Sequence, residues 1–503
     1  MVLKLNSVSP TNKYLFLLVP LSSVFYFLSL PPFSVSPLYL VSFIIIFYHY
    51  LSNKNFKLKF LYIFFFLNYF LSLIWISKSF QTGGIFYTLL GFMMVFLLAN
   101  LLALLNIIVI GFLNAIIKKI NLKIIFIPLS LTLVAIMKEF IMGGFPWNPS
   151  SIIWVNNLFI IKIIQNIGIY GFGIITHLII AFGIYILFHK NKITIFLLTI
   201  FVCGLYGLQF LPINNHDKKN LNEDSDSLSI LIIQPNIKDS LNDFSSLENL
   251  KIYEKHTRIG LKKFPKTDLI IWPEGSLSID LNNRKVILKR IGNLLLGHQK
   301  IILGANAIED YKLFNRMYLI GNNGDVEQYY DKQKLVLFGE YLPFKLSGIS
   351  KFLNIGLSFS KGERDNIINL PKNFLVSPVI CFESIFDSSL IKNNFCKTDF
   401  IIQISNDSWF GDYFGPIQHF KNSLLRSVEQ KKILVRATPS GISAVISHNG
   451  EIIKAINNNK SGVISYKIFK SSFNKECKPF LMMTIMLLLL MYILGISYDR
   501  IRR

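Results

Sequence analysis

Three residues that could together carry acyl-transfer chemistry stand directly after β-rich runs in the second half of the chain. Glu274 follows the run that ends in Ile-Ile-Trp, Lys332 lies within Tyr-Tyr-Asp-Lys-Gln-Lys, and Cys381 ends the run Val-Ser-Pro-Val-Ile. A thiolate forms a labile acyl intermediate, a carboxylate can take the proton of the thiol, and a cation stabilises both the thiolate and an oxyanion. The set predicts Cys381 as a nucleophile, Glu274 as its proton acceptor and Lys332 as the cation.

The four cysteines, Cys203, Cys381, Cys396 and Cys477, are too few for a disulfide framework. None shows the Cys/His spacing of a metal site, so no metal and no cofactor is expected. Cys203 lies in an apolar stretch and is predicted to be a small buried hydrophobic residue. A cysteine after a strand is most often buried and inert, so Cys381 gains meaning only from its acidic and basic companions. Whether Cys396 and Cys477 pair stays open.

The elements that must position these groups lie between residues 213 and 478, where β-rich runs alternate with helical patterns after a charged polar linker. This alternation predicts an α/β domain with a buried sheet. In such sheets ligands gather at the carboxyl ends of the strands, so the three groups are expected to converge. The predicted strands are 228–233, 268–272, 300–303, 317–320, 374–380, 400–404, 433–437 and 444–447, and the predicted helices include 245–264, 283–297 and 415–431.

Apolar stretches on both sides of this domain predict membrane helices, since each is long enough to cross a bilayer. The first lacks a small-x-small cleavage site and is interpreted as retained rather than as a signal peptide. The chain then divides into a seven-helix membrane domain (1–212), the α/β domain (213–478), and a final membrane helix with a basic tail (479–503). The predicted spans are 13–31, 35–52, 58–77, 85–115, 123–142, 158–188, 193–212 and 480–498.

The distribution of Lys and Arg between the spans predicts the orientation. Alternate loops carry basic residues, at 54–59, 118–123 and 190–192, and Arg500, Arg502 and Arg503 close the chain. The other short loops are nearly free of Lys and Arg. By the positive-inside rule, both termini and the basic loops face the cytoplasm, and residues 213–478 lie on the outer face.

The net charge of +23 could suggest nucleic acid, but the lysines are dispersed and no basic-aromatic binding motif occurs. A coding bias towards lysine, or attraction to anionic lipid, explains the charge more simply. Lys138 and Glu139, near the outer end of the fifth span, are interpreted as a snorkelling pair rather than a functional one. The Gly-Gly-Phe-Pro-Trp run at 143–147 fits either a turn with an aromatic interface anchor or a substrate-facing segment.

The ordered sequence blocks of residues 228–467 resemble the nitrilase superfamily, whose members use a Glu-Lys-Cys triad. The further string LVLFGEYLP, together with the membrane spans, makes the whole chain similar to the apolipoprotein N-acyltransferase family and separates it from soluble nitrilases and amidases. The matching blocks are LIIQPNI (231–237), WPEGS (272–276), KQKLVLFGEYLP (332–343), VICFES (379–384), SNDSWFG (405–411) and RATPSGISAV (436–445).

The resemblance implies a membrane-helix domain joined to a nitrilase-like αββα sandwich in the bacterial inner membrane, with the sandwich in the periplasm. It implies that Cys381 takes an acyl chain from a membrane phospholipid as a thioester. The α-amine of the S-diacylglyceryl cysteine of an apolipoprotein then accepts the chain, which is the last step of lipoprotein maturation. The expected partners are these two substrates and the bilayer, without nucleic acid, and the chain is expected to be a monomer.

The resemblance also assigns supporting roles. Glu340 and Glu383 would position the lysine or tune the base, and the alternative is that both are structural, hydrogen-bonded carboxylates. The backbone N–H of Phe382 would be a second oxyanion donor, and Asn315 and Arg436 are weaker candidates for positioning.

The sequence departs from the family pattern near the nucleophile and elsewhere. Phe382 replaces a tyrosine, which puts any role of that hydroxyl in doubt, and Phe244 is the nearest aromatic residue to a missing tryptophan. VLFGE replaces VPFGE, and Pro439 and Ser440 replace two asparagines. None of these changes touches the triad, so we expect activity, with altered lipid contacts.

Other interpretations remain. The apolar segment 344–359 predicts either a mobile, lipid-facing arm or an ordinary core helix. A membrane-anchored amidase that hydrolyses small amides would share the triad, although seven spans exceed what an anchor requires. A transporter or scaffold with a vestigial domain is disfavoured, because the triad is intact and the spans hold no chain of buried charges.

Overall fold

The computed structural model describes residues 10–83, 85–189, 192–207, 227–237, 246–341, 358–363, 367–387, 395–470 and 479–501. By its contacts the chain forms two compact units. The membrane unit comprises Met1–Lys138, Asn148–Pro212 and Phe480–Arg503, and the α/β unit comprises Glu139–Trp147 and Ile213–Pro479. Phe244, Cys477 and nearly all of the apolar segment 344–359 lie outside the described residues.

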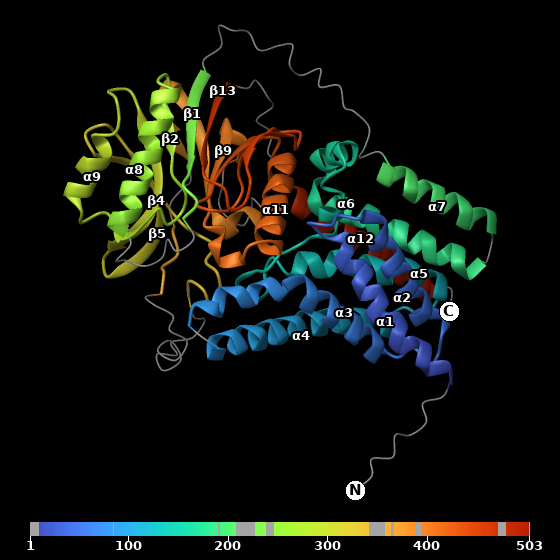
Figure 1. Ribbon diagram of the computed structural model, residues 1–503. Coiled ribbons are helices and arrows are strands. Elements are labelled where there is room, and N and C mark those ends of the chain that lie inside the picture. The colour runs from blue at the N-terminus through green and yellow to red at the C-terminus, as the bar shows by residue number, and fades with distance from the viewer. Residues whose placement is uncertain are drawn as a thin grey trace. The chain divides into compact units, whose positions relative to one another are not determined.

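The described part of the membrane unit is helical, as its long apolar runs require in a medium without water (Figure 1). Its α-helices are α1 (Pro10–Ser29), α2 (Ser36–Ser52), α3 (Leu58–Leu73), α4 (Ile85–Ile116), α5 (Ile120–Met137), α6 (Leu158–His189), α7 (Lys192–Gly207) and α12 (Phe480–Ile501), with 3-10 turns η1 (Ile74–Gly83) and η3 (Ser150–Trp154). Within the described residues, five helical segments are long and apolar enough to cross a membrane: Leu58–Phe80, Ile85–Ile116, Ile120–Met137, Leu158–His189 and Phe480–Asp499. Tyr14–Ser29 and Ser36–Ser52 are shorter apolar helices, so the count of eight spans stays a prediction.

Two sequence interpretations of the membrane part are wrong. Cys203, expected to be buried, is exposed on α7. Lys138 and Glu139, expected to snorkel towards solvent, are both buried, with exposed fractions of 6% and 1%. Burial of a charged side chain is costly unless polar groups compensate it, and for Glu139 the backbone N–H of Asp387 is one such group, at 3.3 Å.

The α/β unit contains two mixed sheets that lie between helices α8 and α9 on one side and α11 on the other (Figure 1). The first sheet has the strand order β13-β1-β2-β4-β5-β6, with β3 paired to β4, and the second has the order β12-β11-β10-β9-β8-β7. Long apolar helices joined to an α/β unit of two mixed sheets confirm the predicted fold class. The elements of the unit are β1 (Ser227–Gln234), α8 (Ser246–Lys263), β2 (Leu269–Ile271), β3 (Leu277–Asp280), α9 (Lys285–Gly292), β4 (Lys300–Glu309), β5 (Lys312–Ile320), β6 (Val326–Asp331), β7 (Ile368–Leu370), β8 (Phe374–Ile380), β9 (Phe400–Ile404), α11 (Phe414–Gln430), β10 (Ile433–Ala437), β11 (Ser443–Ile446), β12 (Ile452–Ile456) and β13 (Gly462–Phe469).

Strand direction determines which side chains can meet. In the first sheet β2 runs parallel to β4, and β4 and β6 each pair antiparallel with β5. Strands β2 and β6 therefore point the same way, and the residues that follow them emerge at one edge of the sheet. In the second sheet β8, β9 and β10 are parallel neighbours, so the residues that follow them also share an edge.

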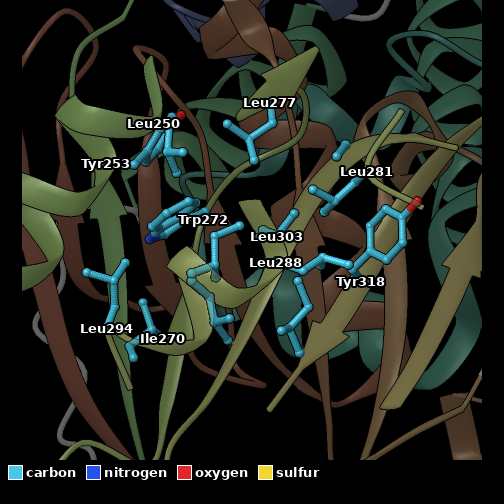
Figure 2. Close-up of a cluster of buried hydrophobic side chains, with 14 of the residues drawn as sticks. Leu250, Tyr253, Ile270, Trp272, Leu277, Leu281, Leu288, Leu294, Leu303 and Tyr318 are labelled. Atoms are coloured by element: carbon cyan, nitrogen blue, oxygen red, sulfur yellow. The ribbon is translucent and has the colours of Figure 1, made fainter. Parts of the chain in front are cut away.

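The core of the first sheet is an apolar cluster between the sheet and helices α8 and α9 (Figure 2). Trp272, directly after β2, stacks on Tyr253 of α8 with ring centroids 4.9 Å apart, and its Nε1 donates to Thr257 Oγ1 at 2.9 Å. Fully burying one such aromatic side chain stabilises the fold by roughly 1.5–3 kcal/mol. Because Trp272 stands two residues before Glu274, this packing also fixes where the loop after β2 begins.

Candidate active site

The nucleophile candidate Cys381 stands at the point where strand β8 turns into the 3-10 helix η8 (Cys381–Ile385). Its backbone φ is +52°, a left-handed conformation that costs a non-glycine residue roughly 1–2 kcal/mol. The carbonyl oxygen of Cys381 accepts from Gln403 Nε2 at 3.1 Å and from Ser384 Oγ at 3.1 Å. These hydrogen bonds hold the strained turn in place. Cys381 itself is buried, with an exposed fraction of 5%.

Lys332 lies between two carboxylates. Its Nζ donates to Glu340 Oε1 at 2.8 Å and to Glu274 Oε1 at 3.2 Å. Asn315 Nδ2 also bridges the two acids, at 3.1 Å to Glu340 and 2.8 Å to Glu274, while the backbone N–H of Lys332 donates to the carbonyl of Asn315 at 2.9 Å. The second oxygen of Glu274 accepts from the backbone N–H of Asn406 at 2.7 Å. The strand ends of both sheets therefore meet around one buried ion pair.

The electrostatics of this cluster fix the resting charges. Burial opposes the charge on Lys332, but Glu274 and Glu340 hold the pKa of the ammonium well above its usual range. Burial raises the pKa of the Cys381 thiol, and the Glu274 carboxylate raises it further, against the opposing effect of Lys332. The resting thiol is therefore protonated.

Glu383 connects the nucleophile turn to the segment after Lys332. One of its carboxylate oxygens accepts from the hydroxyl of Tyr330 at 2.7 Å and from the backbone N–H of Gln333 at 2.6 Å. The other accepts from the backbone N–H of Ile380 at 2.8 Å. Burial raises the pKa of this carboxyl above its usual value. Glu383 is thus a brace that links the backbone before Cys381 to the backbone of the segment after Lys332.

The position of Glu274 depends on a close approach by strand β4. A Cβ added to Gly304 would lie 2.6 Å from the Cα of Glu274 and 2.9 Å from Ile404 Cδ1. Any side chain at this position must displace the loop that carries the carboxylate. Gly304 is thus a site-shaping residue that sequence patterns alone did not identify.

A second polar cluster lies behind the thiol, and the sequence analysis predicted only one of its members. Arg436, on β10, is fully buried and donates from Nη2 to both oxygens of Asp407, at 2.9 and 2.8 Å. His419 of α11 places Nδ1 3.0 Å from Asp407 Oδ1 and Nε2 3.2 Å from the carbonyl oxygen of Cys381. Burial opposes the charge of Asp407, yet the Arg436 guanidinium holds the pKa of this carboxyl well below its usual value.

The Gly-Gly-Phe-Pro-Trp run belongs to the α/β unit. Phe145 stacks on Phe382 with centroids 6.3 Å apart, and Trp147 stacks on His419 at 5.9 Å. Trp147 Nε1 donates to Gln418 Oε1 at 2.8 Å. These contacts place the run beside the nucleophile turn.

The structure therefore brings Glu274, Lys332, Glu340 and Asn315 into one hydrogen-bonded group that interacts electrostatically with Cys381. The backbone of Phe382 directly follows Cys381. Arg436 is separate from this group and belongs to the cluster behind the thiol. Among the residues that the structure describes, no group of three His, Cys, Asp or Glu side chains could hold a metal ion.

Comparison with known proteins covers both halves of the chain. The family model of the apolipoprotein N-acyltransferase N-terminal domain matches residues 22–182, and the carbon-nitrogen hydrolase model matches residues 232–472. An apolipoprotein N-acyltransferase from Rickettsia typhi is 30% identical over 385 residues, which are 72% of this chain and 75% of the relative. The chain belongs to the apolipoprotein N-acyltransferase family.

Other relatives of the apolipoprotein N-acyltransferase family align over a shorter part of their length. The Allorhizobium ampelinum protein is 30% identical over 65% of this chain and 63% of its own length, so less than two thirds of that relative is spanned. A Saccharomyces cerevisiae member of the nitrilase superfamily resembles 48% of this chain at 17% identity, with a TM-score of 0.37.

Proposed function

We propose that the chain transfers a fatty acyl group from a membrane phospholipid to the α-amine of the S-diacylglyceryl cysteine of an apolipoprotein. Membership of the apolipoprotein N-acyltransferase family supports the overall reaction. The observation that carries the chemistry is the buried Lys332 held between Glu274 and Glu340 and coupled electrostatically to the Cys381 thiol. A base, a cation and a nucleophile are thereby supplied by one chain at one place.

In the first half-reaction, Glu274 takes the proton of the Cys381 thiol as the sulfur attacks the ester carbonyl carbon of the phospholipid. Because burial keeps the resting thiol protonated, this proton transfer accompanies the attack. Lys332 and the backbone N–H of Phe382 stabilise the oxyanion. The carbon–oxygen bond then breaks, Glu274 returns its proton to the leaving alkoxide, and a lysophospholipid departs from the thioester.

In the second half-reaction, the free α-amine of the diacylated cysteine attacks the thioester carbonyl carbon. Glu274 accepts the proton that the amine loses, and the carbon–sulfur bond breaks to give the amide. The proton on Glu274 then returns to the Cys381 thiolate.

We further propose that the α/β unit lies outside the cytoplasm of a bacterial inner membrane. The basic residues between apolar stretches support this orientation through the positive-inside rule. Cysteines placed at the exposed Lys285 of α9 and at Lys54, between α2 and α3, test it in a background with Cys203→Ser and Cys381→Ser, which removes both free thiols. A membrane-impermeant maleimide should label the Lys285→Cys variant in intact cells and the Lys54→Cys variant only after permeabilisation. The reverse pattern would refute the orientation.

Incubation of purified protein with labelled phospholipid tests the reaction. We expect an acyl thioester on the peptide that contains Cys381, and its loss on addition of a diacylated lipopeptide with a free amine. Fatty-acid release without amide formation would instead assign a hydrolase. We expect a monomer, and light scattering in detergent checks this.

A further inference from the structure

Helix α11 presents a polar stripe to the nucleophile turn. His419, Ser423 and Arg426 are spaced four and three residues apart, so they lie on one helix face. All three contact η8: His419 at the Cys381 carbonyl, Ser423 Oγ at Ser384 Oγ (3.0 Å), and Arg426 Nη2 at the Ile385 carbonyl (3.1 Å). Buried polar side chains on a helix need hydrogen-bonding partners. Here the turn that carries the thiol supplies these partners.

We propose that His419 is a positioning residue for Cys381, whose Nε2–H donates to the cysteine carbonyl and holds the thiol in its reactive orientation. This inference rests on the proposed role of Cys381 as the nucleophile. The Cys381 carbonyl accepts from three side chains, at 3.2 Å from His419, 3.1 Å from Gln403 and 3.1 Å from Ser384. With φ at +52°, the turn needs such support, since a relaxed backbone would swing the Cβ and the sulfur away.

The partners of the imidazole assign its proton. A carbonyl oxygen can only accept, so the His419 nitrogen that faces Cys381 carries the hydrogen. The opposite nitrogen, Nδ1, lies 3.1 Å from Arg436 Nη2 and 3.0 Å from Asp407 Oδ1. Burial lowers the pKa of His419, although Asp407 opposes this effect. A neutral ring with hydrogen on Nε2 can accept from Arg436 at Nδ1, and Asp407 is satisfied by Arg436 and Ser405.

The imidazole is also held from its face. Trp147 stacks on it with an interplanar angle of 25°, and Phe410 meets it edge-on with centroids 5.1 Å apart. The side chain of His419 is fully buried. Stacking and burial remove rotamer freedom, so the donor remains aimed at the carbonyl. The Gly-Gly-Phe-Pro-Trp run thereby supports the position of the thiol through its tryptophan.

Two substitutions separate the contacts of the two ring nitrogens. Glutamine places its amide nitrogen close to the position of Nε2, so His419→Gln keeps a donor for the Cys381 carbonyl. Asparagine places its amide near Nδ1, so the amide oxygen of His419→Asn can accept from Arg436 Nη2 as Nδ1 does, while the donor to the Cys381 carbonyl is lost. Two rates are measured. The first is the second-order rate constant for alkylation of Cys381 by iodoacetamide, followed by peptide mass spectrometry, and the second is the rate of thioester formation from labelled phospholipid. Alkylation needs no lipid, so failure of this proposal and failure of the proposed function are distinguishable.

We expect His419→Gln to stay within about threefold of the unmodified protein in both rates, and His419→Asn to fall by roughly ten- to a hundredfold. The matched pair His256→Gln and His256→Asn, on α8 away from the site, should change neither rate. Equal losses for the two His419 variants, a greater loss for Gln, or wild-type rates for Asn would overturn the proposal. If the His419→Asn variant does not fold, Gln403→Met takes its place, because it removes another donor from the Cys381 carbonyl. Gln403→Met should slow alkylation of Cys381 by a similar factor, and an unchanged alkylation rate would overturn the proposal.

Discussion

Replacement of Lys332 by methionine tests how the buried cation serves the reaction. Methionine fills a similar volume without charge, and it leaves the carboxylates of Glu274 and Glu340 without their shared cation, although Asn315 still bridges them. The lysine nitrogen lies 2.8 and 3.2 Å from the two acids, which corresponds to attractions of about 5–6 kcal/mol each at an effective dielectric constant of about 20. Desolvation offsets much of this, and removal of one partner from a buried pair typically costs roughly 3–5 kcal/mol of stability.

The chemical effect is separate from the loss of stability. Lys332 lowers the pKa of the Cys381 thiol against burial and the Glu274 charge, so the substitution should shift the alkylation profile of Cys381 to higher pH. Loss of an oxyanion donor should also slow thioester formation by roughly a hundred- to a thousandfold. Iodoacetamide alkylation across pH and a single-turnover assay with labelled phospholipid measure the two effects.

A double variant distinguishes the two consequences. Lys332→Met combined with Glu340→Gln removes one of the two stranded charges, so it should melt at a higher temperature than Lys332→Met alone. It should remain as slow in thioester formation, since the cation is still missing. The exposed Lys312→Met is the matched control for loss of a lysine. A Lys332→Met protein that forms the thioester within a fewfold of the normal rate would refute the reasoning.

Three further substitutions follow from the geometry. Because the pKa of Asp407 is lower in the folded protein, its carboxylate stabilises the fold above the unfolded pKa of about 3.9, and this stability is lost as the pH falls through the folded pKa. Asp407→Asn should therefore lower the melting temperature at pH 7 and flatten the dependence of the melting temperature on acid pH, and an unchanged profile would contradict this. Glu383→Gln places an amide donor against the N–H and O–H groups that now donate to the carboxylate. Thermal unfolding should therefore show that the free energy of unfolding falls by roughly 1–3 kcal/mol, and an unchanged value would show that the brace is dispensable. Gly304→Ala should displace the Glu274 loop and lower the rate of thioester formation by at least about tenfold, whereas Gly297→Ala, at an exposed position, should leave the rate unchanged. Equal rates for the two variants would contradict the close approach of Gly304 to Glu274.

The sequence predicted much of the α/β unit, because its buried strands are short apolar runs with clear boundaries. Strands β8, β9 and β10 have the predicted limits. Strands β3, β6, β7, β12 and β13 were missed. Strands β3 and β7 are only 4 and 3 residues long, and runs such as Val-Glu-Gln-Tyr-Tyr-Asp of β6 mix polar and apolar residues at the solvent-facing part of a sheet. Even so, the lysine that follows β6 was identified, because its motif did not depend on the strand assignment.

The arrangement around the site could be anticipated only in part. Glu274, Lys332 and Cys381 were grouped by residue type and by their position after strands, and the structure places them together. The contacts of Cys381 with His419 and Gln403 link residues far apart in the chain, and no spacing rule predicts them. The polar stripe at His419, Ser423 and Arg426 was a usable signal, because three polar residues on one face of a helix between buried strands need buried partners.

The most direct test of the account is the mass of the peptide that contains Cys381 after incubation with a phospholipid of known acyl chain. The account predicts an added acyl mass that is sensitive to hydroxylamine, absent in Cys381→Ser, and transferred to the amine of a diacylated lipopeptide. An unmodified Cys381 peptide in protein that still converts the lipopeptide, or equal labelling of Cys381→Ser, would contradict it.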